Sequence, residues 1–238
     1  MRSKVSKTID AIMVIIYLTL FVFSFYRVID WNLNNGKNEK INKNLHKYIK
    51  GDNNESFAID FKKITKLNKD AVAYIKVNNT YIDYVVLKTD NNDYYKTHNF
   101  NRNKNKAGWI FVDYRNKLDG DDKNIVVYGL KTIDRGMFSS LKNTLDSDWQ
   151  KNNDNRIVLF ATENSVEKYE VFSTYVSKSK DYIKIDFNEP HEFSKYIQTI
   201  KKKSMYDYGI KVDENDQILT LSTCSGKKRI VLHAKRIV

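Results

Sequence analysis

The sequence is poor in the residues that cross-link, bend or loosen a chain. Its 238 residues include 1 Cys, 1 Pro and 8 Gly. One cysteine cannot form an intramolecular disulfide or a cysteine-rich zinc site, so neither holds this fold together. The scarcity of glycine and proline, with 13% aromatic residues, excludes collagen-like and Pro/Gly-rich disordered chains. The length allows one domain with a substantial core and an additional segment.

Negative charge is also in short supply, with 29 Asp+Glu against 41 Lys+Arg and a net charge of +12. Such a balance suggests an acidic partner, namely a nucleic acid, an anionic membrane or an anionic wall polymer. Nucleic-acid binding needs a basic face with exposed aromatic residues between the charges. Here the aromatic residues alternate within strand-like runs, as core residues do. We therefore expect no nucleic-acid partner.

One long apolar run stands near the N-terminus. Residues 11–26, AIMVIIYLTLFVFSFY, contain no charged residue and lie between Asp10 and Arg27. As a helix they would be about 24 Å long, and residues 9–29 together reach the thickness of a hydrocarbon core. No small-x-small cleavage site follows, which favours an uncleaved anchor over a signal peptide. A buried core helix is disfavoured because the run is apolar on every face.

The charges that flank this run predict its orientation. Arg2, Lys4 and Lys7 precede it, and the positive-inside rule places such residues in the cytoplasm. We therefore expect a single-pass protein of the cell membrane, with residues 1–8 in the cytoplasm, an anchor at residues 9–30 and the remainder outside the cell. Its excess of basic residues then faces the envelope, either as a solvated surface or as an attraction to anionic polymers.

The exterior part divides into a polar segment and a strand-rich domain. Residues 31–56 predict a short tether and a membrane-proximal helix, on which Ile41, Leu45 and Tyr48 have helical spacing. Residues 57–238 form the main domain, with helices expected at 60–68, 137–152 and 190–205. Its eight runs rich in Val, Ile, Tyr and Phe predict strands at 71–77, 81–87, 108–114, 124–130, 156–162, 167–176, 217–224 and 229–238. Eight short strands favour a mostly β fold with a closed or nearly closed barrel, which removes exposed sheet edges.

The single cysteine, Cys224, ends one of these runs. A lone cysteine there is more often an inert buried residue than a nucleophile. Residues 225–228, however, fit a four-residue hairpin connection that would place Cys224 opposite Arg229. A guanidinium beside a thiol lowers the pKa of the thiol and can stabilise an oxyanion. The pair is a candidate nucleophile and electrostatic stabiliser, and the alternative for Arg229 is an ordinary edge-strand cation.

The sequence resembles the class B sortases, which are membrane-anchored cysteine transpeptidases of Gram-positive bacteria. The resemblance extends from about residue 60 to the end of the chain. It includes AGWIFVDYRN at 107–116, NIVVYG at 124–129, ILTLSTC at 218–224 and RIVLHAK at 229–235. TLSTC followed by a strand that opens with arginine is highly specific. The resemblance implies the eight-stranded sortase-type β-barrel, with N-terminal helices and a helix between the sixth and seventh strands.

The resemblance also implies roles for individual residues. Cys224 would be the nucleophile that cleaves a C-terminal sorting signal after threonine, and Arg229 would stabilise the oxyanion and orient the substrate. Ser222 would lie near the floor of the substrate groove. The implied partners are secreted proteins that bear a sorting signal, with a peptidoglycan precursor or another cell-wall amine as acceptor. No cofactor and no metal ion is implied.

One position departs from the family. Where the family has histidine after YG, as general acid and base, this chain has Leu130. Leucine cannot transfer a proton, a function worth roughly 10² to 10⁴ in rate. Lys131 is a poor base when solvated, and His98 and His233 stand where the family often has structural histidines. Two hypotheses follow. One is a transpeptidase that is impaired by loss of the imidazole or uses another acid and base. The other is an inactive pseudosortase that binds sorting signals or a partner sortase.

Overall fold

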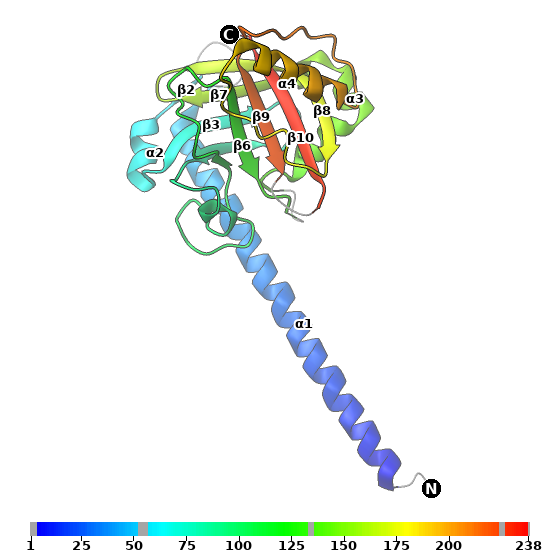
Figure 1. Ribbon diagram of the computed structural model, residues 1–238. Coiled ribbons are helices and arrows are strands. Elements are labelled where there is room, and N and C mark those ends of the chain that lie inside the picture. The colour runs from blue at the N-terminus through cyan, green and yellow to red at the C-terminus, as the bar shows by residue number, and fades with distance from the viewer. Residues whose placement is uncertain (1–3, 52–56, 133–135, 224–226, 238) are drawn as a thin grey trace. The chain divides into compact units, whose positions relative to one another are not determined.

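The computed structural model describes residues 4–51, 57–132, 136–223 and 227–237. The chain forms two compact units, Met1–Lys37 and Asn38–Val238. The first unit consists of most of helix α1 (Lys4–Leu45), which contains a segment, Ile9–Ile29, long and apolar enough to cross a membrane (Figure 1). By its length and composition this segment could serve as a membrane anchor.

The start of residues 31–56, where a tether was expected, is helical instead. Helix α1 continues to Leu45, and the short 3₁₀ helix η1 (His46–Tyr48) follows it directly. This stretch contains Gly36 but no proline, and a single glycine costs a helix only about 1 kcal/mol. The polar composition of the segment therefore does not interrupt its backbone hydrogen bonds.

The second unit is built around a closed eight-stranded barrel, as expected. Its strands are β3 (Ala71–Val77), β4 (Asp83–Leu87), β5 (Phe111–Val112), β6 (Asn124–Gly129), β7 (Ile157–Thr162), β8 (Val166–Ser177), β9 (Ile218–Thr223) and β10 (Arg229–Arg236). Their order is β10-β8-β7-β3-β4-β5-β6-β9, and β9 pairs with β10 to close the barrel. The pairs β4–β5 and β6–β9 are parallel, and the others are antiparallel. A separate small sheet pairs β1 (Ile49–Lys50) with β2 (Ala58–Ile59).

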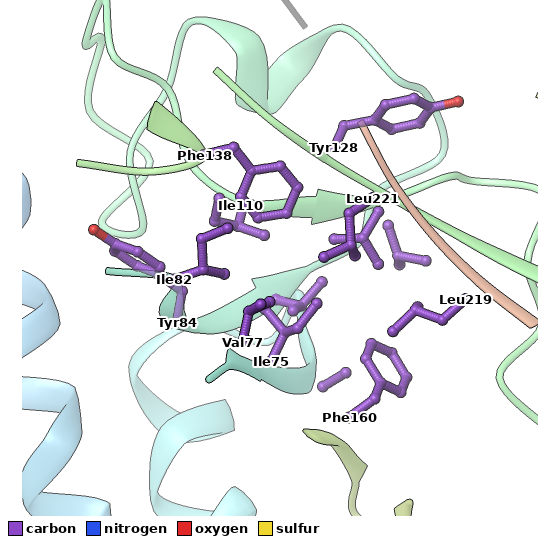
Figure 2. Packing of buried hydrophobic residues seen from close by; sticks show 14 of the residues in the cluster. Ile75, Val77, Ile82, Tyr84, Ile110, Tyr128, Phe138, Phe160, Leu219 and Leu221 are labelled. Atoms are coloured by element: carbon purple, nitrogen blue, oxygen red, sulfur yellow. The ribbon is translucent and has the colours of Figure 1, made fainter. Parts of the chain in front are cut away.

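Alternate apolar side chains from the strands fill the barrel interior. In Figure 2, Ile75, Val77, Phe160, Leu219 and Leu221 converge from three different strands, and each is at most 1% exposed. Burying a side chain of this size contributes roughly 1.5 to 3 kcal/mol relative to exposing it. The Val- and Ile-rich composition of the runs thus selects both the strand conformation and the inward face.

In the chain, helix α4 (Pro190–Lys202) lies between the sixth and seventh barrel strands, β8 and β9, as expected. It packs on the outside of the barrel (Figure 1). Proline occupies its first turn, where the missing N–H has no helical partner to lose. Its buried residues Phe193, Tyr196, Ile197 and Ile200 join a second apolar cluster with residues of β8 and β10. Helix α2 (Phe61–Leu67) is capped by Asp60, whose carboxylate accepts a hydrogen bond from the Lys63 backbone amide at 3.0 Å.

The helix expected at 137–152 is divided into two short pieces. These are the 3₁₀ helix η3 (Ser139–Leu145) and helix α3 (Ser147–Lys151). Asp146 separates them with an extended backbone, φ −81° and ψ 136°. Two further 3₁₀ turns, η2 (Tyr94–Lys96) and η4 (Asn153–Arg156), lie in the connections. The single helix expected at 137–152 is therefore wrong at Asp146.

Candidate functional site

Three strand ends meet at one edge of the barrel. In the parallel pair β6–β9, Gly129 lies opposite Thr223, so both strands end together. In the antiparallel pair β9–β10, Val231 lies opposite Ser222, so β10 begins at the same edge. The residues that follow β6 and β9 in the chain are Leu130 and Cys224. The register thus brings the segments of the expected site to a single edge, although they are far apart in the sequence.

Arg229 is the first residue of β10 and is half-buried. Its Nη1 donates a hydrogen bond to the carbonyl oxygen of Thr223 at 3.5 Å, and the backbone amide of Ile230 donates to Thr223 Oγ1 at 2.9 Å. Cys224 itself lies outside the described residues. Thr223 precedes it in the chain, so the guanidinium lies beside the peptide group that leads into the cysteine. The remaining N–H groups of the guanidinium form a planar fork suited to an oxyanion or a carboxylate.

Ser222 is fully buried in β9. Its Oγ donates to the hydroxyl of Tyr182 at 2.8 Å and lies 3.3 Å from the Thr223 carbonyl oxygen. The serine hydroxyl is therefore bonded within the protein. Tyr182 belongs to the connection between β8 and α4 and is itself fully buried. This tyrosine could not be predicted from the sequence, because nothing in the local pattern relates it to a strand 40 residues further on.

Leu130 follows β6 directly and is half-buried. Its carbonyl oxygen accepts a hydrogen bond from the Phe138 backbone amide at 3.1 Å, and the next residue, Lys131, bridges to Met137. Gly129 is required by packing, since a Cβ at this position would lie 2.5 Å from Phe138 Cγ. The backbone around Leu130 is thus held by hydrogen bonds and close packing and needs no imidazole to define it.

A buried acid supports the preceding tyrosine of β6. Asp113 is fully buried and accepts hydrogen bonds at 2.9 Å from the hydroxyl of Tyr128, from Arg115 Nε and Nη2, and from Asn92 Nδ2. Burial alone would raise the pKa of the Asp113 carboxyl, but the hydrogen bonds from Arg115 and Tyr128 outweigh it and hold the pKa below its ordinary value. In Figure 2 the ring of Tyr128 points away from the centre of the core. Asp113 and Arg115 are close together in the sequence, but the hydrogen bond between Asp113 and Tyr128 of β6 could not be predicted from it.

His233 lies in a closed hydrogen-bond network and is fully buried. Thr220 Oγ1 donates to Asn124 Oδ1 at 2.7 Å, so it must accept from His233 Nδ1, 2.8 Å away. His233 Nε2 then accepts from the Tyr175 hydroxyl at 3.0 Å. Burial, assisted by the charge of Lys203, lowers the pKa of His233 to about 3. The ring is therefore neutral near pH 7 with both nitrogens occupied, which suits a structural role.

The other three histidines also make local contacts. The ring of His98 stacks on Tyr94, with centroids 4.1 Å apart, and His46 Nε2 lies 3.2 Å from Asp83 Oδ1. His191 is 73% exposed in the first turn of α4. Within the described part of the chain, no hydrogen bond joins a histidine to Leu130 or Arg229, and no group of three or more His, Cys, Asp or Glu could hold a metal ion.

Comparison with known proteins agrees with this geometry. A family model described as the sortase domain matches residues 75–237. Sortase B of Listeria monocytogenes is 37% identical over 186 residues, which cover 75% of this chain and 74% of the relative. Sortase B of Staphylococcus aureus is 30% identical over 244 residues, which cover 100% of this chain and 99% of the relative.

Solved structures extend the agreement to three dimensions. Sortase B from Bacillus anthracis in complex with AAEK1 has a TM-score of 0.79 at 31% identity and covers 86% of this chain and 98% of its own. Clostridium perfringens sortase B has a TM-score of 0.71 at 37% identity, with 75% and 100% covered. Family match, relatives and barrel all lead to the same assignment. The chain belongs to the sortase family, and within it to the class B sortases.

Proposed function

We propose that this protein is a membrane-anchored cysteine transpeptidase whose nucleophile is Cys224. The observation that supports this proposal most directly is the position of Arg229. Its guanidinium contacts the carbonyl of Thr223, the residue before the cysteine, at the edge where β6, β9 and β10 meet. A cation at this point would stabilise both a thiolate and the negative oxygen that develops when a carbonyl is attacked.

The proposed reaction has two acyl transfers. The thiolate of Cys224 attacks the threonine carbonyl carbon of a C-terminal sorting signal, the C–N bond breaks, and the departing amine takes up a proton. A wall amine then attacks the thioester carbon, the C–S bond breaks, a new amide forms, and the attacking nitrogen loses a proton. The sulfur leaves as the thiolate with which the cycle began. Arg229 would hold the oxyanion in both steps.

Both steps move a proton, and Leu130 cannot do this. We infer that Leu130 occupies the position where the family has its histidine. A positioned acid or base accelerates such steps by roughly 10² to 10⁴, so turnover should be slow, with water carrying the proton. The second candidate function follows from the same residue: a pseudosortase that binds sorting signals or a partner sortase without turnover.

Turnover can be tested on the full chain in an uncharged detergent. Quenched fluorescent peptides with varied sorting signals, supplied with a peptide amine, should be cleaved slowly, and mass spectrometry should find the acyl group on Cys224. The substitution Cys224→Ala should abolish both signals. Leu130→His should raise the cleavage rate by about 10² to 10⁴, whereas Leu130→Asn, which cannot exchange a proton near pH 7, should not.

The outcomes separate the two candidates. Peptide binding without an acyl adduct, before and after the Leu130→His substitution, would establish the pseudosortase instead. Neither binding nor cleavage in any variant would contradict both functions. Rates equal in Leu130→His and Leu130→Asn would show that the position does not act in proton transfer.

We also propose that residues 9–30 anchor the protein in the membrane, with residues 1–8 in the cytoplasm and residues 57–238 outside. The apolar segment of α1 and the basic residues before it support this orientation. In intact cells, external protease should remove an epitope placed at the C-terminus and spare one at the N-terminus. The opposite pattern would reverse the orientation.

A further inference from the structure

A hollow of about 560 Å³ opens beside the turn that follows β6. Its lining includes Tyr81, Lys131, Lys142 and Asn143, together with three hydroxyl side chains. The volume lies within the range of about 300 to 1,000 Å³ that small-molecule sites occupy. Lys131 directly follows Leu130, so the hollow borders the proposed transfer site.

The described residues that line this hollow carry only positive charge. Lys131 and Lys142 are both exposed, and the described lining contains no carboxylate. Other lysines of the barrel unit do have acidic partners, for example Lys184 with Glu192 at 3.0 Å. In the part of the chain that the structure describes, Lys131 and Lys142 form no ion pair. Two like charges beside one concave surface raise the local positive potential and favour an anion there.

The walls of the hollow are already ordered. The Thr132 backbone amide donates to Ser139 Oγ at 2.7 Å, and Ser139 Oγ donates in turn to the Thr132 carbonyl oxygen at 2.6 Å. Across the hollow, the Tyr81 backbone amide donates to Ser140 Oγ at 2.9 Å, which ties the β3–β4 turn to η3. A ligand would therefore not have to order these hydroxyl groups, which lowers the conformational-entropy cost of binding at this part of the surface.

Two side chains in the lining are free to contact a ligand. The ring of Tyr81 is 60% exposed at the rim, where it offers a flat apolar face. Asn143 is half-exposed, and among the described residues its side-chain amide makes no hydrogen bond. A flat ring, an amide and two ammonium groups together match a ligand that has a ring, polar substituents and a negative charge.

We propose that this hollow binds an anionic saccharide of the cell envelope. Lys131 and Lys142 contact its carboxylate or phosphate, Tyr81 packs against the sugar ring, and Asn143 hydrogen-bonds to a ring substituent. This site goes beyond the proposed transpeptidase, because its binding does not require Cys224 or a proton donor. Its place beside Leu130 would keep wall material next to the site of acyl transfer.

The test is a binding measurement on the full chain in an uncharged detergent at low salt. Calorimetry compares N-acetylmuramic acid, which bears a carboxylate, with N-acetylglucosamine, which does not, and with N-acetylglucosamine 1-phosphate as the phosphate source. We expect the neutral sugar to bind at least tenfold more weakly than the better anion. Preference for the first or last ligand identifies a carboxylate or a phosphate as the natural anion. Raising the salt concentration should weaken binding of either anion.

Matched variants distinguish a site from general attraction to a basic protein. The double substitution Lys131→Gln with Lys142→Gln should weaken anion binding about tenfold. The control Lys62→Gln with Lys195→Gln removes the same charge from α2 and α4 and should change the affinity less than twofold. Tyr81→Ala should weaken binding of the saccharide more than binding of inorganic phosphate. Cys224→Ala should bind as the unmodified chain does, so failure of the transpeptidase proposal leaves this result unaffected.

Three results would overturn the proposal: no binding of either anion at millimolar concentration, equal binding of the neutral sugar, or equal losses in the two double variants. A measurement on the unmodified chain keeps the test valid even if a variant does not fold. In the unmodified chain, the bound anion should protect Lys131 and Lys142 from acetylation, read by mass spectrometry, while Lys62 and Lys195 react at the same rate as before. Uniform protection of all four lysines would also contradict a defined site.

Discussion

Lowering the pH from 7.5 to 5 should destabilise the barrel by about 2 kcal/mol through His233 alone. The ring is fully buried, and both of its nitrogens have hydrogen-bond partners that satisfy the neutral form, with Nδ1 donating to Thr220 and Nε2 accepting from Tyr175. Protonation would turn the acceptor nitrogen into a donor facing the Tyr175 hydroxyl and would place a charge in the core, near Lys203. The folded protein therefore resists protonation that the unfolded chain accepts.

The magnitude follows from the two pKa values. The unfolded chain titrates near the ordinary value of 6.5, and the folded protein near 3. Between these values the unfolded state binds more protons, so stability falls as the pH falls through 6.5. At pH 5 the loss is about 1.4 kcal/mol for each of roughly 1.5 pH units, or about 2 kcal/mol. This figure hardly changes if the folded pKa lies anywhere below about 4.

The assay is urea unfolding of the full chain in an uncharged detergent at pH 7.5 and pH 5, followed by near-ultraviolet circular dichroism. The control is His233→Gln, which is uncharged throughout this range. Its own stability will be lower, but only the difference between the two pH values matters. The carboxyls whose pKa values are lowered by their partners, such as Asp113 and Asp181, lose their contribution only below about pH 4 and affect both proteins equally.

The reasoning fails if the unmodified chain and His233→Gln lose stability equally between the two pH values. If His233→Gln does not fold, nuclear magnetic resonance of the unmodified chain tests the same reasoning. The ring protons of His233 should show no titration above about pH 4. A midpoint between pH 6 and 7 would show that the ring is solvated or protonated in the folded state, contrary to the network described.

Three further substitutions test the packing around the site by urea unfolding. Gly129→Ala should lower the free energy of unfolding by about 1 to 3 kcal/mol, because its Cβ would lie 2.5 Å from Phe138 Cγ. The control Gly36→Ala, whose Cβ would have no atom within 4 Å, should be neutral or stabilise α1. Equal effects of the two substitutions would refute the close approach at Gly129. Asp113→Asn should cost about 2 to 4 kcal/mol, since a buried carboxylate loses its charge-assisted hydrogen bonds, and a loss under 0.5 kcal/mol would contradict them. Ser222→Ala should cost about 1 kcal/mol through its hydrogen bond to the buried tyrosine hydroxyl, and an unchanged midpoint would show that this bond contributes nothing.

The strands were predictable where side-chain burial decides the backbone. Seven of the eight expected runs overlap their strands nearly end to end. The exception is residues 108–114, of which only Phe111–Val112 form a strand. The Trp109 backbone amide donates to the Tyr95 carbonyl oxygen in η2 at 2.8 Å, outside the sheet, whereas the Asp113 amide still donates to Val126 of β6 at 2.8 Å. An apolar run records that a segment is buried, but not which neighbour satisfies its backbone groups.

Among the helices, too, one prediction agrees with the structure and another does not. The apolar period of residues 190–205 predicted α4 well, because one face of that helix packs on the barrel. The single helix expected at 137–152 was wrong, since Asp146 takes an extended conformation between two short pieces. Both pieces bury side chains, so the break at Asp146 cannot be recognised from the pattern of apolar residues.

The candidate site was predictable in part because two of its components are close in the sequence. Arg229 stands five residues after Cys224, and a short connection between paired strands brings such residues together. The structure places the guanidinium beside the Thr223 carbonyl at the end of β9, and its proximity to Cys224, which lies outside the described residues, stays a prediction. Leu130 could be recognised only through the family resemblance, because an apolar residue after a strand has no chemistry of its own to attract notice.

The sequence by itself determined that this chain has one apolar segment, a barrel of eight strands and a single cysteine at a strand end, because burial and local spacing are written in residue types. Only the tertiary structure decided the contacts between distant segments. The serine of β9 bonds to a tyrosine before α4, an aspartate after β5 holds the tyrosine of β6, and two lysines from separate segments line one hollow. Such pairs depend on strand register and barrel closure, which arise from the packing of the whole chain.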